Sequence, residues 1–180
     1  MKKKECLLKR VSLSGDARSV LKDLVIPPEM LKEQTKGGRV TGVCEKSKEG
    51  GTKYLEVTGV IDPVDSTAPY IGWKILLPGQ WNLRSVQIGG GANNGSVPSL
   101  DGAMLMSNYR PIEHGYVVFG DDSGHQSEDP MSAEFAANEE SLQNYIRQHL
   151  IKMNGVMHAV VKAAYGVDAE KVYFAGGSAG

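Results

Sequence analysis

The last five residues of the chain, 176–180, read GGSAG and fit the pattern G-x-S-x-G. This spacing forms a nucleophile elbow, a sharp turn after a strand that exposes the serine hydroxyl at the edge of a sheet. Small residues are needed two positions before and after the serine, because neighbouring backbones crowd the turn. The apolar residues 172–174 supply a strand directly before it. The pattern predicts Ser178 as a nucleophile, and a plain glycine-rich turn is the alternative.

A second glycine-rich segment, GGGANNG at 89–95, directly follows another predicted strand. Acyl transfer needs backbone N–H groups aimed at the developing oxyanion. In α/β hydrolases one donor follows the nucleophile, here Ala179, and the other lies in a loop after an earlier strand. Gly90, Gly91 and Ala92 are the predicted donors of that loop. A phosphate-binding loop is the alternative, although the segment lacks the lysine of G-x-x-x-x-G-K-[ST] and does not fit G-x-G-x-x-G.

Two acidic residues, a serine and a histidine stand together in GDDSGH, residues 120–125. A metal site or a catalytic role for His125 is one interpretation. Adjacent side chains in an extended loop point apart, and a triad is assembled from distant segments, so we favour a loop held by Asx-type hydrogen bonds. His149 lies on the apolar stripe of a predicted helix, which favours a buried, hydrogen-bonded histidine. The two cysteines and four histidines show no zinc-site spacing.

The elements that must position these residues alternate between strands and helices. The longest helix is predicted between an N-cap at Asn138 and a C-terminal Gly166, and Gly155 is expected to kink it. The remaining elements are predicted, in chain order, at 14–26 (helix), 39–61 (hairpin), 70–78 (strand), 85–88 (strand), 100–109 (helix), 116–120 (strand) and 171–176 (strand). Apolar strands alternating with helices indicate an α/β fold, with a mostly parallel sheet flanked by helices.

The composition and charge of the chain limit the classes of function that it could have. The chain has 180 residues, enough for one domain with a sizeable core, and a formal net charge of −1. This charge gives no support for a nucleic acid or an anionic membrane as a partner. No apolar run approaches the ~20 residues of a membrane span, and the N-terminal apolar segment is too short for a signal peptide. Cys6 and Cys44 are either two unrelated thiols or one disulfide that requires an oxidising compartment.

The order of the motifs resembles that of the tannase and feruloyl esterase family of serine esterases. The matching segments are LPGQWNLR, QIGGGANNG, HGYVVFGDDSGH, FAANEESLQNYIRQHLIKMNGVMHAVVKAAYG and VYFAGGSAG. The resemblance covers residues 57–180 and implies an α/β-hydrolase fold that hydrolyses esters of aromatic acids. It also implies that Ser178 is the nucleophile, and that Ala179 together with Gly91, or its neighbour Gly90, forms the oxyanion hole.

The resemblance further implies a secreted or periplasmic protein with a disulfide between Cys6 and Cys44, and a cytoplasmic location is the alternative. The family commonly carries a cysteine directly before the nucleophile, bonded to one beside the catalytic histidine. Here that position is Gly177, so this bond cannot form. The family also has a lid, often with bound calcium, and then the catalytic acid and histidine, all after the elbow. No cofactor is therefore expected within these residues.

These observations predict the N-terminal half of a serine carboxylesterase. Residues 1–38 are expected to form an N-terminal arm, and residues 39–180 the first half of an α/β-hydrolase domain that is incomplete in this chain. The expected partners are a small aromatic ester and either the C-terminal half of the protein or a second copy of the chain. By itself the chain is expected to be inactive. The alternatives are an inactive remnant that binds an aromatic ligand or a partner protein, and a nucleotide-binding domain.

Overall fold

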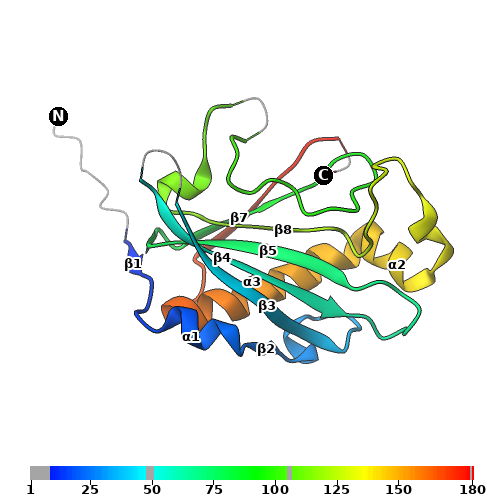
Figure 1. Cartoon of the computed structure of the whole chain (residues 1–180), viewed down its shortest axis with the longest axis horizontal. Helices are drawn as coiled ribbons and strands as arrows, with labels where there is room; N and C mark the ends of the chain where they lie inside the picture. Colours follow the sequence, from blue (N-terminus) through cyan, green and yellow to red (C-terminus); the bar gives the residue numbers. More distant parts are fainter. Residues whose placement is uncertain (1–8, 48–50, 105–106, 179) are drawn as a thin grey trace.

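The computed structural model describes residues 9–47, 51–104, 107–178 and 180. Within these residues the strands are β1 (Val11–Ser12), β2 (Val25–Ile26), β3 (Gly37–Ser47), β4 (Lys53–Asp62), β5 (Ile71–Pro78), β6 (Gln80–Trp81), β7 (Arg84–Ile88), β8 (Val117–Asp121) and β9 (Lys171–Ala175). The α-helices are α1 (Ala17–Lys22), α2 (Glu139–Gln143) and α3 (His149–Tyr165), and 3₁₀ turns lie at Pro28–Met30, Pro111–His114 and Glu134–Ala137. One large sheet has the order β2-β3-β4-β5-β8-β7-β9. Figure 1 shows α1 and α3 side by side along this sheet.

The large sheet is mixed, so the prediction of a mostly parallel sheet was wrong. Strands β2, β3, β4, β5 and β8 pair antiparallel in that order, whereas β7 pairs parallel with β8 and with β9. Short connections join β3 to β4 and β4 to β5, and a short connection returns the chain antiparallel. The predicted hairpin is confirmed as β3 and β4, with Val43 opposite Val57. The α/β architecture holds, with its parallel part confined to three strands.

Those three strands position the two glycine-rich motifs. Parallel strands end at the same edge of a sheet, and β7 and β9 are direct neighbours, with Gln87 opposite Phe174. The loop after β7 and the turn after β9 therefore lie next to each other, as Figure 1 shows near the C-terminus. A crossover through α2 and α3 connects β8 to β9, as parallel strands require.

The long predicted helix is confirmed in three consecutive pieces. Asn138 caps it by accepting a hydrogen bond from the backbone N–H of Ser141 at 2.9 Å. A π-helical turn at Asn144–Gln148 separates α2 from α3, and Gly166 ends α3 with φ of 75°. Gly155 does not interrupt α3. A Cβ at this position would lie only 3.1 Å from the Cα of Leu31, so the glycine permits the 3₁₀ turn at Pro28–Met30 to approach α3 closely.

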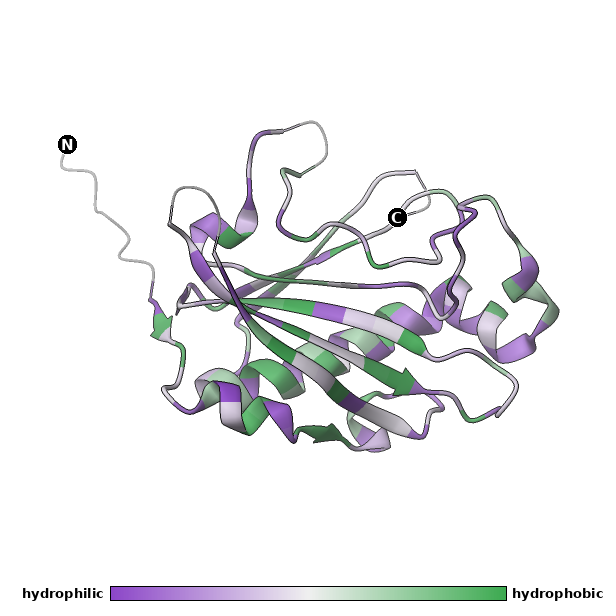
Figure 2. Cartoon of the chain, viewed as in Figure 1, coloured by the Kyte–Doolittle hydropathy of each residue, from purple (hydrophilic) through white to green (hydrophobic). Residues whose placement is uncertain are grey.

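The core lies mainly between α1, α3 and one face of the sheet. The side chains of Ile71, Trp73, Ile75 and Leu77 belong to it, which confirms the predicted apolar face of β5. Figure 2 shows hydrophobic residues along α1 and α3 where they meet the sheet. A smaller cluster, including Leu76, Val86, Leu100, Ile112 and Val118, covers the opposite face. In the described part of the chain, no helix is both long and apolar enough to cross a membrane.

Two predicted helices differ from the structure. The first is shorter than expected, because the chain leaves α1 at Lys22 and residues 25–26 pair with β3 as β2. The second was expected at 100–109, but residues 100–104 and 107–109 are irregular, and 105–106 lie outside the described residues. The first helix is shorter because pairing with β3 holds residues 25–26 in a strand, with Val25 opposite Arg39. In the segment 9–38, α1 and β2 contact β3 of the large sheet, whereas β1 pairs with β6 in a separate two-stranded sheet.

Candidate functional site

Ser178 lies in a tight turn three residues after β9. The backbone N–H of Gly180 donates to the carbonyl of Gly177 at 3.0 Å, which closes the turn. Ser178 has φ of 58°, a left-handed conformation that is uncommon for residues other than glycine. Strain of this kind is expected at a nucleophile elbow, where the chain bends sharply to present the serine. The predicted oxyanion donor Ala179 lies outside the described residues.

The glycine-rich loop at 89–95 lies directly against this turn. The backbone N–H of Gly89 donates to the carbonyl of Ala175 at 2.9 Å, which attaches the start of the loop to β9. A Cβ at Gly89 would lie 2.6 Å from the carbonyl carbon of Gly180, and a Cβ at Gly180 would lie 2.9 Å from the nitrogen of Gly90. Side chains cannot fit between the two backbones. The structure therefore brings together the two segments whose N–H groups the sequence predicts as oxyanion donors.

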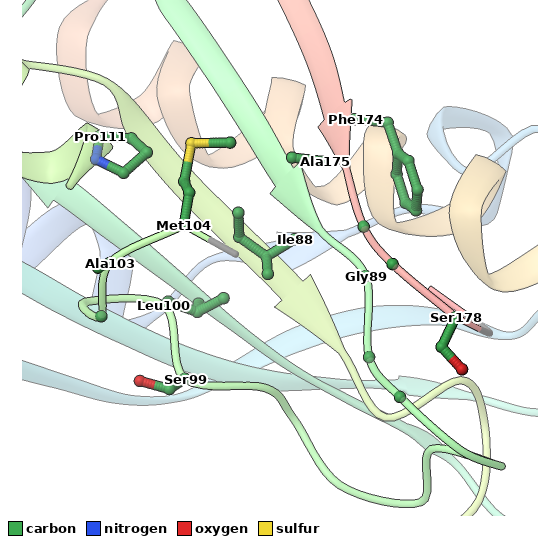
Figure 3. Close-up of a pocket in the computed structure, with 15 residues that line it drawn as sticks. Ile88, Gly89, Ser99, Leu100, Ala103, Met104, Pro111, Phe174, Ala175 and Ser178 are labelled. Atoms are coloured by element: carbon green, nitrogen blue, oxygen red, sulfur yellow. The ribbon is translucent and has the colours of Figure 1, made fainter. Parts of the chain in front are cut away.

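A cavity of about 550 Å³ opens beside Ser178. Its walls come from β7, the glycine-rich loop, the segment 99–104, Pro111, the end of β9 and the turn at Ser178. The larger apolar side chains in these walls are Ile88, Leu100, Met104, Pro111 and Phe174. Figure 3 shows Ser178 at one end of the cavity, with Met104 and Pro111 toward the other end. An apolar cavity of this size suits a small organic ligand next to the serine.

A buried polar network lies at the end of β8. Asp121 is 5% exposed, and its Oδ1 lies 2.6 Å from Nδ1 of His149. The same carboxylate accepts hydrogen bonds from the backbone N–H of Ser123 at 2.9 Å and from the side chain of Gln87 at 3.2 Å. His149 is thus hydrogen-bonded, as its place on the apolar stripe predicts, and its side chain is mostly buried, with 12% exposed. The predicted Asx-type bonding of the loop is confirmed by the bond from Ser123 to Asp121.

The other histidine of interest, His125, is 5% exposed and lies away from the cavity at Ser178. Its ring lies 4.3 Å from that of Phe135 and 5.9 Å from that of Tyr145, measured between ring centroids. Burial lowers the pKa of His125, so the ring is neutral at neutral pH. The catalytic interpretation of His125 is not favoured by this aromatic setting. In the described part of the chain, no group of three or more His, Cys, Asp or Glu residues could hold a metal ion.

Asp122 is the titratable group with the clearest consequence for stability. Burial raises its pKa from 3.8 to about 7, although Gln126, Gly124 and Gly72 donate hydrogen bonds to it. Between these two pH values the native carboxyl keeps a proton that the unfolded chain has released. The free energy of unfolding therefore falls as pH rises through this window, by a few kcal/mol at most.

We expect Asp122→Asn to reduce this fall, because the asparagine does not titrate. Urea unfolding between about pH 4 and about pH 8 measures the effect. The exposed Asp23→Asn variant controls for the loss of one carboxylate elsewhere. Equal pH slopes in wild type and Asp122→Asn would contradict the assignment.

The disulfide between Cys6 and Cys44 stays a prediction. Cys44 on β3 is exposed and forms no disulfide with another described residue, while Cys6 lies outside the described residues.

Sequence reasoning missed Asn94, whose side chain packs against Gly90 of the glycine-rich loop. The second asparagine in GGGANNG was an available signal, because asparagine is favoured where a loop needs a positive φ. Asn94 has φ of 58°.

Comparisons with known proteins place the chain among esterases in sequence and in fold. The chain is 37% identical over 163 residues to an uncharacterized esterase of Agrobacterium fabrum, covering 86% of this chain and 29% of that protein. Feruloyl esterase B from Aspergillus oryzae has a similar structure, with a TM-score of 0.66 and 17% identity over 89% of this chain and 32% of that one. Tannin acyl hydrolase from Aspergillus niger gives a TM-score of 0.55 and 16% identity over 93% of this chain and 33% of that one.

The two solved structures show a shared fold, and the chain spans 29% of the length of the curated relative. The family described as tannase and feruloyl esterase matches residues 55–180, which is well over half of the chain. This match includes β5, β7, β8 and β9 with both glycine-rich motifs. The chain therefore belongs to the tannase and feruloyl esterase family.

Proposed function

We propose that the chain carries the nucleophile and the oxyanion hole of a serine carboxylesterase with an α/β-hydrolase fold. The observation that carries this proposal is the positive φ of Ser178, in a turn after β9 that lies against a glycine-rich loop. In the proposed reaction the hydroxyl oxygen of Ser178 attacks the ester carbonyl carbon, and its proton passes to a base. The alcohol leaves, and water then hydrolyses the acyl-enzyme.

The proposed oxyanion donors are the backbone N–H groups of Ala179 and of Gly91 or Gly90. Preorganised backbone donors stabilise the negative charge that develops on the carbonyl oxygen, and they need no rearrangement during the reaction. The contact between Gly180 and the Gly89–Gly90 peptide supports this assignment, because it holds the loop directly beside the elbow. Bulky side chains at these positions would push the two donors apart.

The activity is proposed for the full-length protein, because the chain spans only about a third of its relatives. In this fold the catalytic acid and histidine follow the serine in chain order. Among the described residues, no histidine lines the cavity at Ser178. His149 is engaged by Asp121, and His114 stacks on Tyr109 with ring centroids 4.3 Å apart. We therefore assign the base to another part of the full-length protein.

The proposed substrates are small esters of aromatic acids. The apolar side chains of the cavity, including Leu100 and Met104, give an aromatic ring a surface from which water is excluded. Two structural relatives are named as a feruloyl esterase and as a tannin acyl hydrolase, and this supports a phenolic acyl group. A small-molecule ester is thus the proposed partner, and calcium in a lid stays a prediction.

We expect the full-length protein to hydrolyse methyl ferulate with a kcat/KM up to about tenfold above that for methyl hexanoate. The reason is that contact of an aromatic acyl ring with Phe174 adds about 0.5–1.5 kcal/mol beyond the burial of apolar area, and 1.4 kcal/mol is tenfold. Steady-state kinetics on matched methyl esters measures this ratio. A preference for the aliphatic ester would refute the aromatic acyl site while leaving the esterase proposal intact. Thermal stabilisation by nucleotides, without ester hydrolysis, would favour the nucleotide-binding alternative.

A further inference from the structure

The glycine-rich loop has a second neighbour besides the elbow. A Cβ at Gly90 would lie 2.7 Å from Cγ of Asn94, so the Asn94 side chain fills the space beside the Gly90 Cα. On its other side, Gly90 meets the backbone of Gly180. The Gly89–Gly90 peptide is therefore held between the elbow and one asparagine side chain.

The other end of this side chain is attached to the buried network of β8. The Nδ2 of Asn94 donates to the hydroxyl of Ser123 at 2.7 Å. Ser123 is 1% exposed, and its backbone N–H donates to Asp121, which in turn contacts His149. A chain of short contacts thus runs from α3 through β8 to the loop. Because Ser123 is buried and bonded to Asp121, its hydrogen bond with Asn94 fixes the position of the Asn94 side chain.

The backbone of the loop directs the Asn94 side chain toward Gly90. The N–H of Asn94 donates to the carbonyl of Gly91 at 2.9 Å, and φ of 58° turns the chain back at this residue. The next residue, Gly95, donates to the carbonyl of Asp122 at 3.3 Å, which anchors the end of the loop. Asparagine tolerates this left-handed conformation better than most residues do.

In the described part of the chain, the side-chain oxygen of Asn94, Oδ1, contributes no stabilising hydrogen bond. This oxygen is buried and has no hydrogen-bond partner within the described residues. An unsatisfied buried acceptor destabilises the folded state, so packing this oxygen against Gly90 is unfavourable for folding. Such costs are found where a local arrangement serves the function of a site.

We propose that Asn94 is a positioning residue for the oxyanion hole, which holds the Gly89–Gly90 peptide at a fixed distance from the elbow. This inference rests on the proposed esterase function. Asn94 acts through Gly90 and not on the substrate, so its effect falls on the developing oxyanion. An interaction that matters only in the transition state changes kcat and leaves KM nearly constant.

The test compares Asn94→Ala with Asn93→Ala in the full-length protein. The Asn93 side chain donates to the carbonyls of Met131 and Ser132, away from Gly90, so it is a matched loop asparagine. Loss of a whole oxyanion donor costs about 10²–10³ in kcat, so a displaced donor should cost about 10- to 100-fold. We expect that loss in Asn94→Ala with an unchanged KM, and a kcat near wild type in Asn93→Ala.

A second variant separates positioning from folding. Asn94→Asp keeps the side-chain shape and can accept a hydrogen bond from Ser123, but its charged form opposes the oxyanion. The ratio of its kcat to that of wild type should rise as pH falls and the new carboxyl is protonated. A ratio that does not change with pH would contradict the placement of Asn94 beside the oxyanion.

Hydrogen exchange provides a readout that needs no catalysis. Backbone exchange in the peptide 88–92 should be faster in Asn94→Ala than in wild type, and unchanged in Asn93→Ala. Equal exchange in all three proteins, or an equal loss of kcat in both variants, overturns the inference. The proposed function fails separately, if Ser178→Ala retains the wild-type esterase activity.

Discussion

Replacement of Ser178 by alanine in the full-length protein should lower kcat for an aryl ester by about 10⁶-fold. The variant cannot form the acyl-enzyme, because its side chain has no oxygen to attack the carbonyl carbon. The oxyanion donors and the cavity remain, so a residual acceleration of about 10³–10⁴ over water should persist. KM should change little, since the hydroxyl contributes to the transition state more than to ground-state binding.

Covalent labelling checks the same assignment independently of turnover. A fluorophosphonate should modify wild type at Ser178, and peptide mapping should find no adduct in Ser178→Ala. The matched control is Ser99→Ala, since Ser99 lines the same cavity and its hydroxyl donates to Asp101 at 3.2 Å. This control should keep both labelling and activity. An adduct on Ser99, or full turnover without Ser178, would show that the elbow is not the nucleophilic site.

The elbow and the loop could be predicted from sequence because their requirements are local. The turn at Ser178 needs small neighbours within two residues, and the strand before it is visible as an apolar run. The apolar face of β5 follows from strict alternation, and the ends of the long helix follow from Asn138 and Gly166. In each case the decisive atoms lie within one segment of the chain.

Strand direction and the partners of polar side chains could not be predicted in this way. Hydrophobic periodicity does not tell which strand lies beside which, so the antiparallel pairing of β5 with β8 was missed. The GDDSGH segment is a cluster in sequence, yet Asp121 contacts His149 from α3 and Gln87 from β7. Asn94 likewise reaches Ser123 across 29 positions. These contacts depend on topology, which a single sequence does not specify.

The contact between elbow and loop leads to a second large effect, for Gly180→Ala. The added Cβ would lie 2.7 Å from the carbonyl carbon of Gly89 and 2.9 Å from the nitrogen of Gly90. Both atoms are backbone, so they can move only if the whole loop shifts away from Ser178. Overpacking of this kind costs about 1–3 kcal/mol of stability. A displaced loop no longer supplies its oxyanion donor, so kcat/KM should fall by about 10²–10³.

Gly79→Ala is the matched control, because no atom lies within 4 Å of a Cβ at that position. It should keep wild-type kinetics, and a loss similar to that of Gly180→Ala would point to a general sensitivity to added methyl groups. The cause can be assigned with a phosphonate analogue of the tetrahedral intermediate. If Gly180→Ala displaces an oxyanion donor, inhibition by the analogue should weaken in proportion to kcat/KM, while the affinity for the product acid stays constant. Equal weakening of both ligands would instead mean that the cavity itself has collapsed, since ground-state binding needs the cavity walls but not the oxyanion hole.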